Sequence, residues 1–272
     1  NKELMKRWQK ITINVTKWLV LLVYLAVALA FASSKRADLV CKSVDVVIAD
    51  SLENGFVTKR DVMRLFQGKD ANPVGKPLNK INTLELEERL AKFNSIRDAQ
   101  VYKTIDEKLV VRIEQRKPQV RIINRYGQSY YIDDKATIMP LSPNYTAHVL
   151  VINGHITEPF EPAYNTNILT WKGNSEGDAQ PLINRLYDFA QFILTDKFWR
   201  AQIAQVYVGG VNEIELVPRV GSHIVLLGSL DNYEEKLENL KVFYEKALPA
   251  EGWNKYKLIN LKYSNQIICT KK

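Results

Sequence analysis

The sequence contains little cysteine and histidine, which restricts the kinds of site it could form. Its cysteines are Cys41 and Cys269, and its histidines are His148, His155 and His223. None of them occurs in a CxxC, HExxH or His-x-His spacing, so the sequence indicates neither a redox centre nor a metal site. The two cysteines could pair only if their Cα atoms came within about 7 Å, and two separate thiols are the simpler interpretation.

Motifs of enzyme active sites are also missing. The sequence has no GxSxG elbow, no Walker phosphate loop and no Rossmann glycine pattern after a strand. The adjacent carboxylates Asp133 and Asp134 could serve acid–base chemistry, but neighbouring strand residues point to opposite faces, which favours a turn. The sequence therefore predicts a protein that is not an enzyme and that holds no cofactor or metal.

Basic charge is concentrated at one end of the chain. The net charge is +8, and residues 1–36 contain seven basic side chains against one acidic side chain. The remaining residues hold 31 basic and 29 acidic side chains, so no basic stripe marks a nucleic-acid-binding face. We therefore expect no nucleic-acid partner.

A long apolar run near the N-terminus predicts a membrane anchor. Residues 18–32 carry no charge, and extension back to Ile11 gives a segment near the length of about 20 residues that a spanning helix needs. More basic residues precede the run than follow it, which places the N-terminus in the cytoplasm. We expect a cytoplasmic tail at 1–17, a transmembrane signal-anchor with its flank at 18–36, and an extracytoplasmic remainder.

The same apolar run has an alternative interpretation as a cleaved signal peptide. Residues 30–32, Ala-Phe-Ala, match the small-x-small pattern that precedes cleavage sites. Apolar residues before the run, Ile13 and Val15, lengthen the segment and favour an anchor that is retained.

Residues 37–117 are predicted to form a small domain of strands and helices in the order β-α-α-β-β. Ser, Thr, Asp or Asn followed three residues later by an acidic residue is typical of a helix start. Three strands with two helices on one face would form an independent layer structure. The predicted elements are a strand at 44–48, a helix opened by Thr58 and Asp61, a helix opened by Asn82 and Glu85, and strands at 96–103 and 109–113.

Residues 118–272 are predicted to form a β domain, which makes the whole protein an α+β chain. We expect a curved, mostly antiparallel sheet with two helices on one face. One helix bears Leu182 and Ile193 on its apolar stripe, and the other is opened by a capping box of Asp231 and Glu234. The predicted strands lie at 120–123, 129–132, 138–141, 148–152, 203–208, 214–217, 223–227, 255–261 and 266–270, and an irregular loop at 157–180.

Taken in order, these segments resemble the FtsQ/DivIB family of bacterial cell-division proteins. The resemblance covers nearly the whole chain, and it depends on the order and spacing of several short motifs behind an anchor. These motifs are Val57-Thr58-Lys59-Arg60-Asp61-Val62, Ala99-x-Val101-Tyr102, Leu109-x-Val111-x-Ile113-Glu114-x-Arg116-x-Pro118, Tyr131-Ile132-Asp133, Gly221 to Gly228 with Lys236-Leu237-x-x-Leu240, and Ile259-Asn260-Leu261-Lys262-Tyr263.

The resemblance implies a POTRA domain followed by a β domain, and a role in assembling the division machinery at the septum. The implied partners are coiled-coil subunits of the FtsB (DivIC) and FtsL type, together with septal synthase components, and the implied location is the inner membrane. Such proteins help to control septal peptidoglycan synthesis. POTRA-like modules also act in outer-membrane translocation, and an accessory protein of that process is the alternative function.

The last predicted strand is the main candidate for partner binding. A terminal strand commonly lies at a sheet edge, where an extended partner can add by β-augmentation. The family also uses this strand and the preceding helix for its FtsB-like partner. The alternative is an ordinary closing strand whose edge is solvated, together with a helix whose apolar stripe faces the core. The predicted partner-binding residues are Tyr263, Ser264, Asn265, Gln266, Ile267, Ile268, Cys269 and Thr270 on the strand, and Tyr233, Leu237, Leu240 and Tyr244 on the helix.

Insertion of a proline at Ile267 is the mutation that this hypothesis suggests first. Proline lacks the backbone N–H that an added strand would use, so partner capture is expected to be abolished while the ectodomain stays folded. A pull-down of the partner measures the effect, and unchanged capture by the insertion variant would contradict the hypothesis.

Overall fold

The structure is a computed structural model, and its described part comprises two compact units. Two short segments, 50–57 and 93–97, lie between parts of the first unit in the sequence but belong to the second unit. The described residues are 15–29, 39–50, 54–67, 72–158, 164–170, 180–263 and 266–272. The first unit is drawn from Asn1–Ala49, Thr58–Lys92 and Asp98–Glu114, and the second from Asp50–Val57, Phe93–Arg97 and Gln115–Lys272.

Residues 15–29 form a helix of mainly apolar residues. Its side chains are exposed, among them Trp18 and Leu22 at 69% each. None of the described helices is both long enough and apolar enough to cross a membrane. The predicted tail at 1–17 and anchor at 18–36 lie partly outside the described residues, so membrane anchoring stays a prediction.

The first unit has the predicted order of strands and helices, with a short 3₁₀ turn added. Its sheet has the order β1-β3-β2, with β1 and β3 parallel. Val46 and Ile48 on β1 lie opposite Val111 and Ile113 on β3, and all four are buried, which explains the alternating pattern of these strands. The elements are β1 (Ser43–Ile48), α2 (Lys59–Leu65), η1 (Leu78–Lys80), α3 (Thr83–Ala91), β2 (Ile96–Lys103) and β3 (Lys108–Gln115).

The two helices of this unit begin where the capping residues predict. Thr58 and Asp61 form a complete capping box, in which each side chain accepts a hydrogen bond from the other residue's backbone N–H. Asn82 caps α3 by accepting from the Glu85 N–H at 3.3 Å. In α3, Glu87 also accepts a 2.7 Å hydrogen bond from the backbone N–H of Val101 in β2, a strand at one end of this sheet.

The second unit is built on a nine-stranded sheet of order β12-β11-β10-β9-β8-β7-β4-β5-β6. Three neighbouring pairs are parallel, namely β4–β7, β7–β8 and β10–β11, so the sheet is mixed and less uniformly antiparallel than predicted. Helical connections explain two of these pairs, β7–β8 and β10–β11, because a strand reached through a helix can return in the same direction, whereas β4 and β7 are connected through β5 and β6. The strands are β4 (Pro118–Ile123), β5 (Ser129–Asp133), β6 (Ile138–Met139), β7 (Leu150–Gly154), β8 (Ile203–Gly210), β9 (Glu213–Pro218), β10 (Ile224–Gly228), β11 (Tyr256–Asn260) and β12 (Ile268–Lys271).

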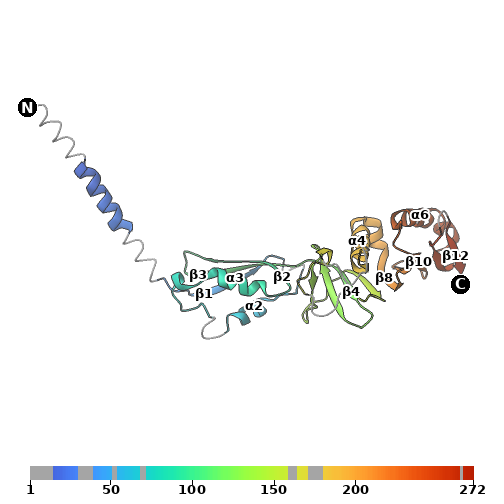
Figure 1. Cartoon of the computed structure of the whole chain (residues 1–272), viewed down its shortest axis with the longest axis horizontal. Helices are drawn as coiled ribbons and strands as arrows, with labels where there is room; N and C mark the ends of the chain where they lie inside the picture. The colour runs from blue at the N-terminus through green and yellow to red at the C-terminus, as the bar shows by residue number, and fades with distance from the viewer. Residues whose placement is uncertain are drawn as a thin grey trace, which may run out of the picture. The chain divides into compact units, whose positions relative to one another are not determined.

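Four α-helices accompany this sheet in the residues that the structure describes, where two were predicted. The predicted helices are α4 (Leu182–Thr195) and α6 (Tyr233–Lys246), and Figure 1 shows both on the same side of β8 and β10. The additional helices are short: α5 (Lys197–Gln202) and α7 (Leu248–Glu251). A single apolar cluster joins the buried faces of α4 and α6 to the strands, so helices and sheet share one core.

The predicted capping box at the start of α6 is wrong. The N-cap residue is Asn232, which has a φ of 52° and makes no side-chain capping bond. Asp231 instead accepts a 2.9 Å hydrogen bond from Arg185 on α4. The Asp231 carboxylate therefore forms a long-range ion pair and does not cap the helix. Asn232 is suited to the N-cap position because asparagine tolerates the left-handed conformation.

Two buried polar side chains organise the start of the second unit. Gln115 is fully buried, accepts from the Val57 N–H at 2.7 Å, and donates to the Asn54 carbonyl at 2.7 Å. Asp133 is also fully buried, and its Oδ1 accepts from the backbone N–H of Thr137 at 2.8 Å. The other oxygen of Asp133 pairs with Arg116 at 2.9 Å, so this carboxylate shapes a turn, as predicted.

Replacement of Asp133 by alanine is expected to destabilise the second unit by about 3–5 kcal/mol, because Arg116 would lose its carboxylate partner and the N–H of the buried Thr137 would lose its hydrogen bond. The neighbouring change Asp134→Ala is the control. Asp134 pairs with Arg97 at a more exposed position, so its loss is expected to cost about 1 kcal/mol or less. Denaturant unfolding followed by tryptophan fluorescence measures both changes, and equal losses would contradict this account.

Candidate partner-binding edge

One end of the nine-stranded sheet is covered by the chain itself. The end strand β6 is two residues long and buried. The backbone of the following segment bonds to it: Ile138 donates to Thr166 at 3.0 Å, and Asn165 donates to Ile138 at 2.9 Å. The backbone groups at this end are therefore already paired, which prevents strand addition there.

The opposite end of the sheet is formed by β12, which pairs with β11 on one side. The pairing is antiparallel, with Ile259 opposite Cys269 and Asn260 opposite Ile268. In the part of the chain that the structure describes, no strand lies on the outer side of β12. The sheet thus has an open edge at the strand that the sequence singled out.

The alternation of a β-strand shows which backbone groups of β12 face outward. The Lys272 N–H donates to the Lys255 carbonyl at 3.2 Å, so the backbone of Lys272 faces β11. Successive residues of a strand direct their N–H and C=O groups to alternate sides, so Thr270 also faces β11. The N–H and C=O groups of Cys269 and Lys271 therefore point away from the sheet.

The side chains of β12 divide between the two faces of the sheet. Ile267, just before the strand, and Cys269 pack against the core, whereas Ile268 is 44% exposed. Burial raises the pKa of the Cys269 thiol, which disfavours the reactive thiolate. The exposed side chains of Ile268 and Thr270 are thus free to contact an added strand, and Cys269 has a packing role.

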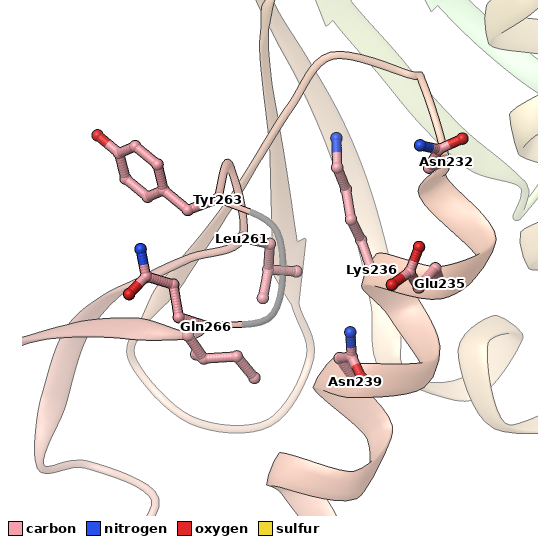
Figure 2. A pocket seen from close by; sticks show the side chains of 8 residues that line it. Asn232, Glu235, Lys236, Asn239, Leu261, Tyr263 and Gln266 are labelled. Carbon is pink, nitrogen blue, oxygen red and sulfur yellow. The ribbon is translucent and has the colours of Figure 1, made fainter.

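A groove lies between α6 and the connection that leads into β12. Figure 2 shows Lys236 and Asn239 on α6 facing Leu261 and Gln266 across this groove. The groove continues along α6 past Val242 toward the end of the helix. Its two parts share Glu235, Asn239, Gln266 and Ile267 as lining residues.

Three of the predicted binding residues on α6 lie beneath this surface. Leu237, Leu240 and Tyr244 have exposed fractions of 3% or less and belong to the apolar core. Tyr233 packs edge-on against Phe189, with ring centroids 5.0 Å apart. Leu237, Leu240 and Tyr244 hold α6 on the sheet and present no surface to a partner in this structure. Tyr233 is half-buried, and its role as a contact residue stays a prediction.

Comparison with known families now identifies the architecture. The family model described as "FtsQ/DivIB, C-terminal related" matches residues 117–270. The model described as "POTRA-like domain" matches residues 39–114. The chain belongs to the FtsQ/DivIB C-terminal related family. A search of curated proteins found no match. The nine strands from β4 to β12 lie almost entirely within the FtsQ/DivIB-related region, and the second unit is called the FtsQ/DivIB-related unit below.

The groove-lining residues of the FtsQ/DivIB-related unit were missed by the sequence analysis. All but Leu261 lie on one side of α6 or at its ends, and the polar members of this stripe, spaced by three or four residues, are the signal that could have indicated them. On the strand side, the structure places Tyr263, Gln266 and Ile267 at the groove, while Ser264 and Asn265 lie outside the described residues. The missed residues are Asn232, Glu235, Lys236, Asn239, Val242, Phe243, Lys246, Ala247 and Leu261.

A buried histidine supports α6 from below. His223 is 3% exposed, and its Nε2 lies 2.7 Å from the hydroxyl of Tyr244. Burial lowers the pKa of His223 below 6.5, because the charged form loses its hydration. The contact joins α6 to the residue that precedes β10.

The stability of the FtsQ/DivIB-related unit is expected to decrease as the pH falls below the unfolded value of 6.5 for His223. In that range the imidazole of His223 takes up a proton more readily in the unfolded chain than in the folded protein. The free energy of unfolding therefore rises with pH, by at most about 1.4 kcal/mol per pH unit, and the contribution of His223 is complete above this range. Unfolding measured across this range should show a smaller slope for His223→Gln. The exposed His155→Gln is the control, and an unchanged slope in His223→Gln would refute the assignment.

Proposed function

We propose that this protein is a non-enzymatic scaffold of the bacterial division machinery that captures a partner strand at β12. The open edge of β12 carries this proposal, because the other end of the same sheet is covered by the protein's own backbone. The family matches over 39–114 and 117–270 support a division-protein role. The proposed partners are subunits of the FtsB/DivIC and FtsL type, and the proposed outcome is control of septal peptidoglycan synthesis.

The proposed location is the inner membrane at the septum, with the N-terminus in the cytoplasm and the POTRA-like and FtsQ/DivIB-related regions outside it. The apolar run at 18–32 and the basic residues before it support this orientation. A single-pass anchor would hold the β12 edge close to membrane-bound partners and raise their effective concentration. Septal synthase components are further candidates for the assembled complex.

The proposed mechanism is β-augmentation. The outward N–H and C=O groups of Cys269 and Lys271 would bond to the backbone of the incoming strand and supply affinity. Ile268 and Thr270 would contact its side chains and supply specificity. The groove beside α6 would receive the residues that adjoin the added strand, since it begins where β12 begins.

An accessory role in outer-membrane translocation is the second candidate. The POTRA-like match over 39–114 favours it, because such modules also act in that process. The FtsQ/DivIB-related match covers the larger part of the chain and favours division. In-cell crosslinking from the β12 edge would separate the two, because they require different partners.

Proline at Cys269 tests strand addition without disturbing the protein's own sheet. Cys269→Pro removes an outward N–H that β11 does not use, so binding of an FtsB/DivIC-type subunit is expected to weaken by at least about tenfold, or about 1.4 kcal/mol. Cys269→Ala keeps the N–H while losing the same thiol, and it should bind nearly as well as the native protein. A pull-down with the co-expressed subunit, followed by titration, measures the difference.

A folding control accompanies this test. Thr270→Pro removes an N–H that faces β11, so it is expected to loosen the edge strand and lower the melting temperature more than Cys269→Pro does. If the proline and alanine variants at position 269 captured the subunit equally, strand addition at β12 would be excluded.

A further inference from the structure

We propose that the segment added at β12 is an extended peptide with acidic residues near the Lys271 end of the strand. The inference deepens the proposed function and rests on strand addition at this edge. Residues 255–272 contain five lysines and no acidic residue. The closing pair of strands thus has an excess of positive charge that the rest of the ectodomain lacks.

The strand pairing brings several of these lysines together. The backbone of Lys272 bonds to Lys255, which places these two residues opposite each other. Lys271 lies opposite Tyr256, and Lys257 occupies the irregularity that follows Tyr256 in β11. Like charges across a strand pair repel each other, so this arrangement is unfavourable until a negative charge approaches.

Neutralisation of these lysines within the protein is incomplete. Lys255 forms an ion pair with Glu251 at the end of α7. In the described part of the chain, no ion pair joins Lys257, Lys271 or Lys272 to an acidic side chain, and Lys271 and Lys272 are exposed. Their charges are therefore available to a chain that lies along the outer side of β12.

The opposite end of β12 has a different character. There the groove is lined by Glu235 and Lys236 beside Ile267 and Gln266, so its charges are of both signs. At the far end, Lys271 and Lys272 carry positive charge without an acidic side chain beside them in the described residues. The end of β12 at Lys271 is therefore where acidic residues of the partner strand would find charges of only the opposite sign.

A peptide fits this edge better than an anionic lipid surface does. Phosphate groups accept hydrogen bonds but do not donate them, so they would leave the outward carbonyls of Cys269 and Lys271 unpaired. A peptide strand supplies alternating donors and acceptors along with its carboxylates. The backbone and the lysines together therefore favour an acidic strand.

Two synthetic peptides test this inference with the full-length chain. One alternates valine with glutamate, and the other has glutamine at every glutamate position. The glutamate peptide is expected to bind about tenfold more tightly at low salt, and high salt should remove most of this preference. Titration of the fluorescently labelled peptides with the protein measures both affinities.

Charge variants assign the preference to the end of β12. The double change Lys271→Gln/Lys272→Gln keeps the backbone groups and removes the two side-chain charges, so it is expected to remove the preference for glutamate over glutamine. The control is Lys197→Gln/Arg200→Gln on α5, which removes the same charge elsewhere and should keep the preference.

The outcomes separate this inference from the proposed function. Equal binding of the two peptides, with both lost in Cys269→Pro, would overturn the acidic class and leave strand addition intact. Glutamate-dependent binding that Cys269→Pro does not weaken would overturn strand addition itself. If vesicles of phosphatidylglycerol bound through Lys271 and Lys272 while neither peptide bound, the basic edge would be a membrane contact and the inference would fail.

Discussion

The two ends of the nine-stranded sheet satisfy their backbone groups in different ways, and the proposed binding depends on this difference. At the β6 end, the backbone of Asn165 and Thr166 pairs with Ile138 and leaves no row of free donors and acceptors. At the β12 end, the described chain supplies no such cover. Within the nine-stranded sheet, the open edge in the described residues is therefore the one at β12, and water hydrogen-bonds to its outward backbone groups until a strand is added.

The interior of the second unit keeps this edge in place. α6 is held on the sheet by Leu237 and Leu240, and Tyr244 contacts both His223 and Trp253. The β11–β12 pair is joined to the rest of the sheet through the parallel contact between β10 and β11. The groove and the strand edge thus share one support, so a change in the aromatic contacts beneath α6 would alter both together.

Much of the fold could be predicted from the sequence, because alternating apolar residues and capping side chains act locally. The Thr58–Asp61 box and the strand at 96–103 are confirmed. The errors arise where distant residues decide the outcome. Asp231 pairs with Arg185 and leaves the cap of α6 to Asn232, and β10 accepts β11 in parallel because α6 carries the chain across. No local pattern contains these long-range contacts.

The candidate site was predicted in part for the same reason. A terminal strand without proline indicated the edge, and β12 is the end strand of the sheet. Partner binding at this edge stays a prediction. The apolar stripe of α6 was the more conspicuous pattern, but that stripe lies inside the core, and the polar side from Glu235 to Lys246 faces the groove. Hydrophobic periodicity finds the buried face of a helix and says little about its surface partner.

The covered β6 end has a consequence for assembly. A sheet with two open edges could join head to tail with further copies and grow into a fibre. If a second chain paired with β12, the sheet would offer no open edge at its β6 end, so no further chain could add there. Strand addition at β12 would thus give a shared sheet of fixed size.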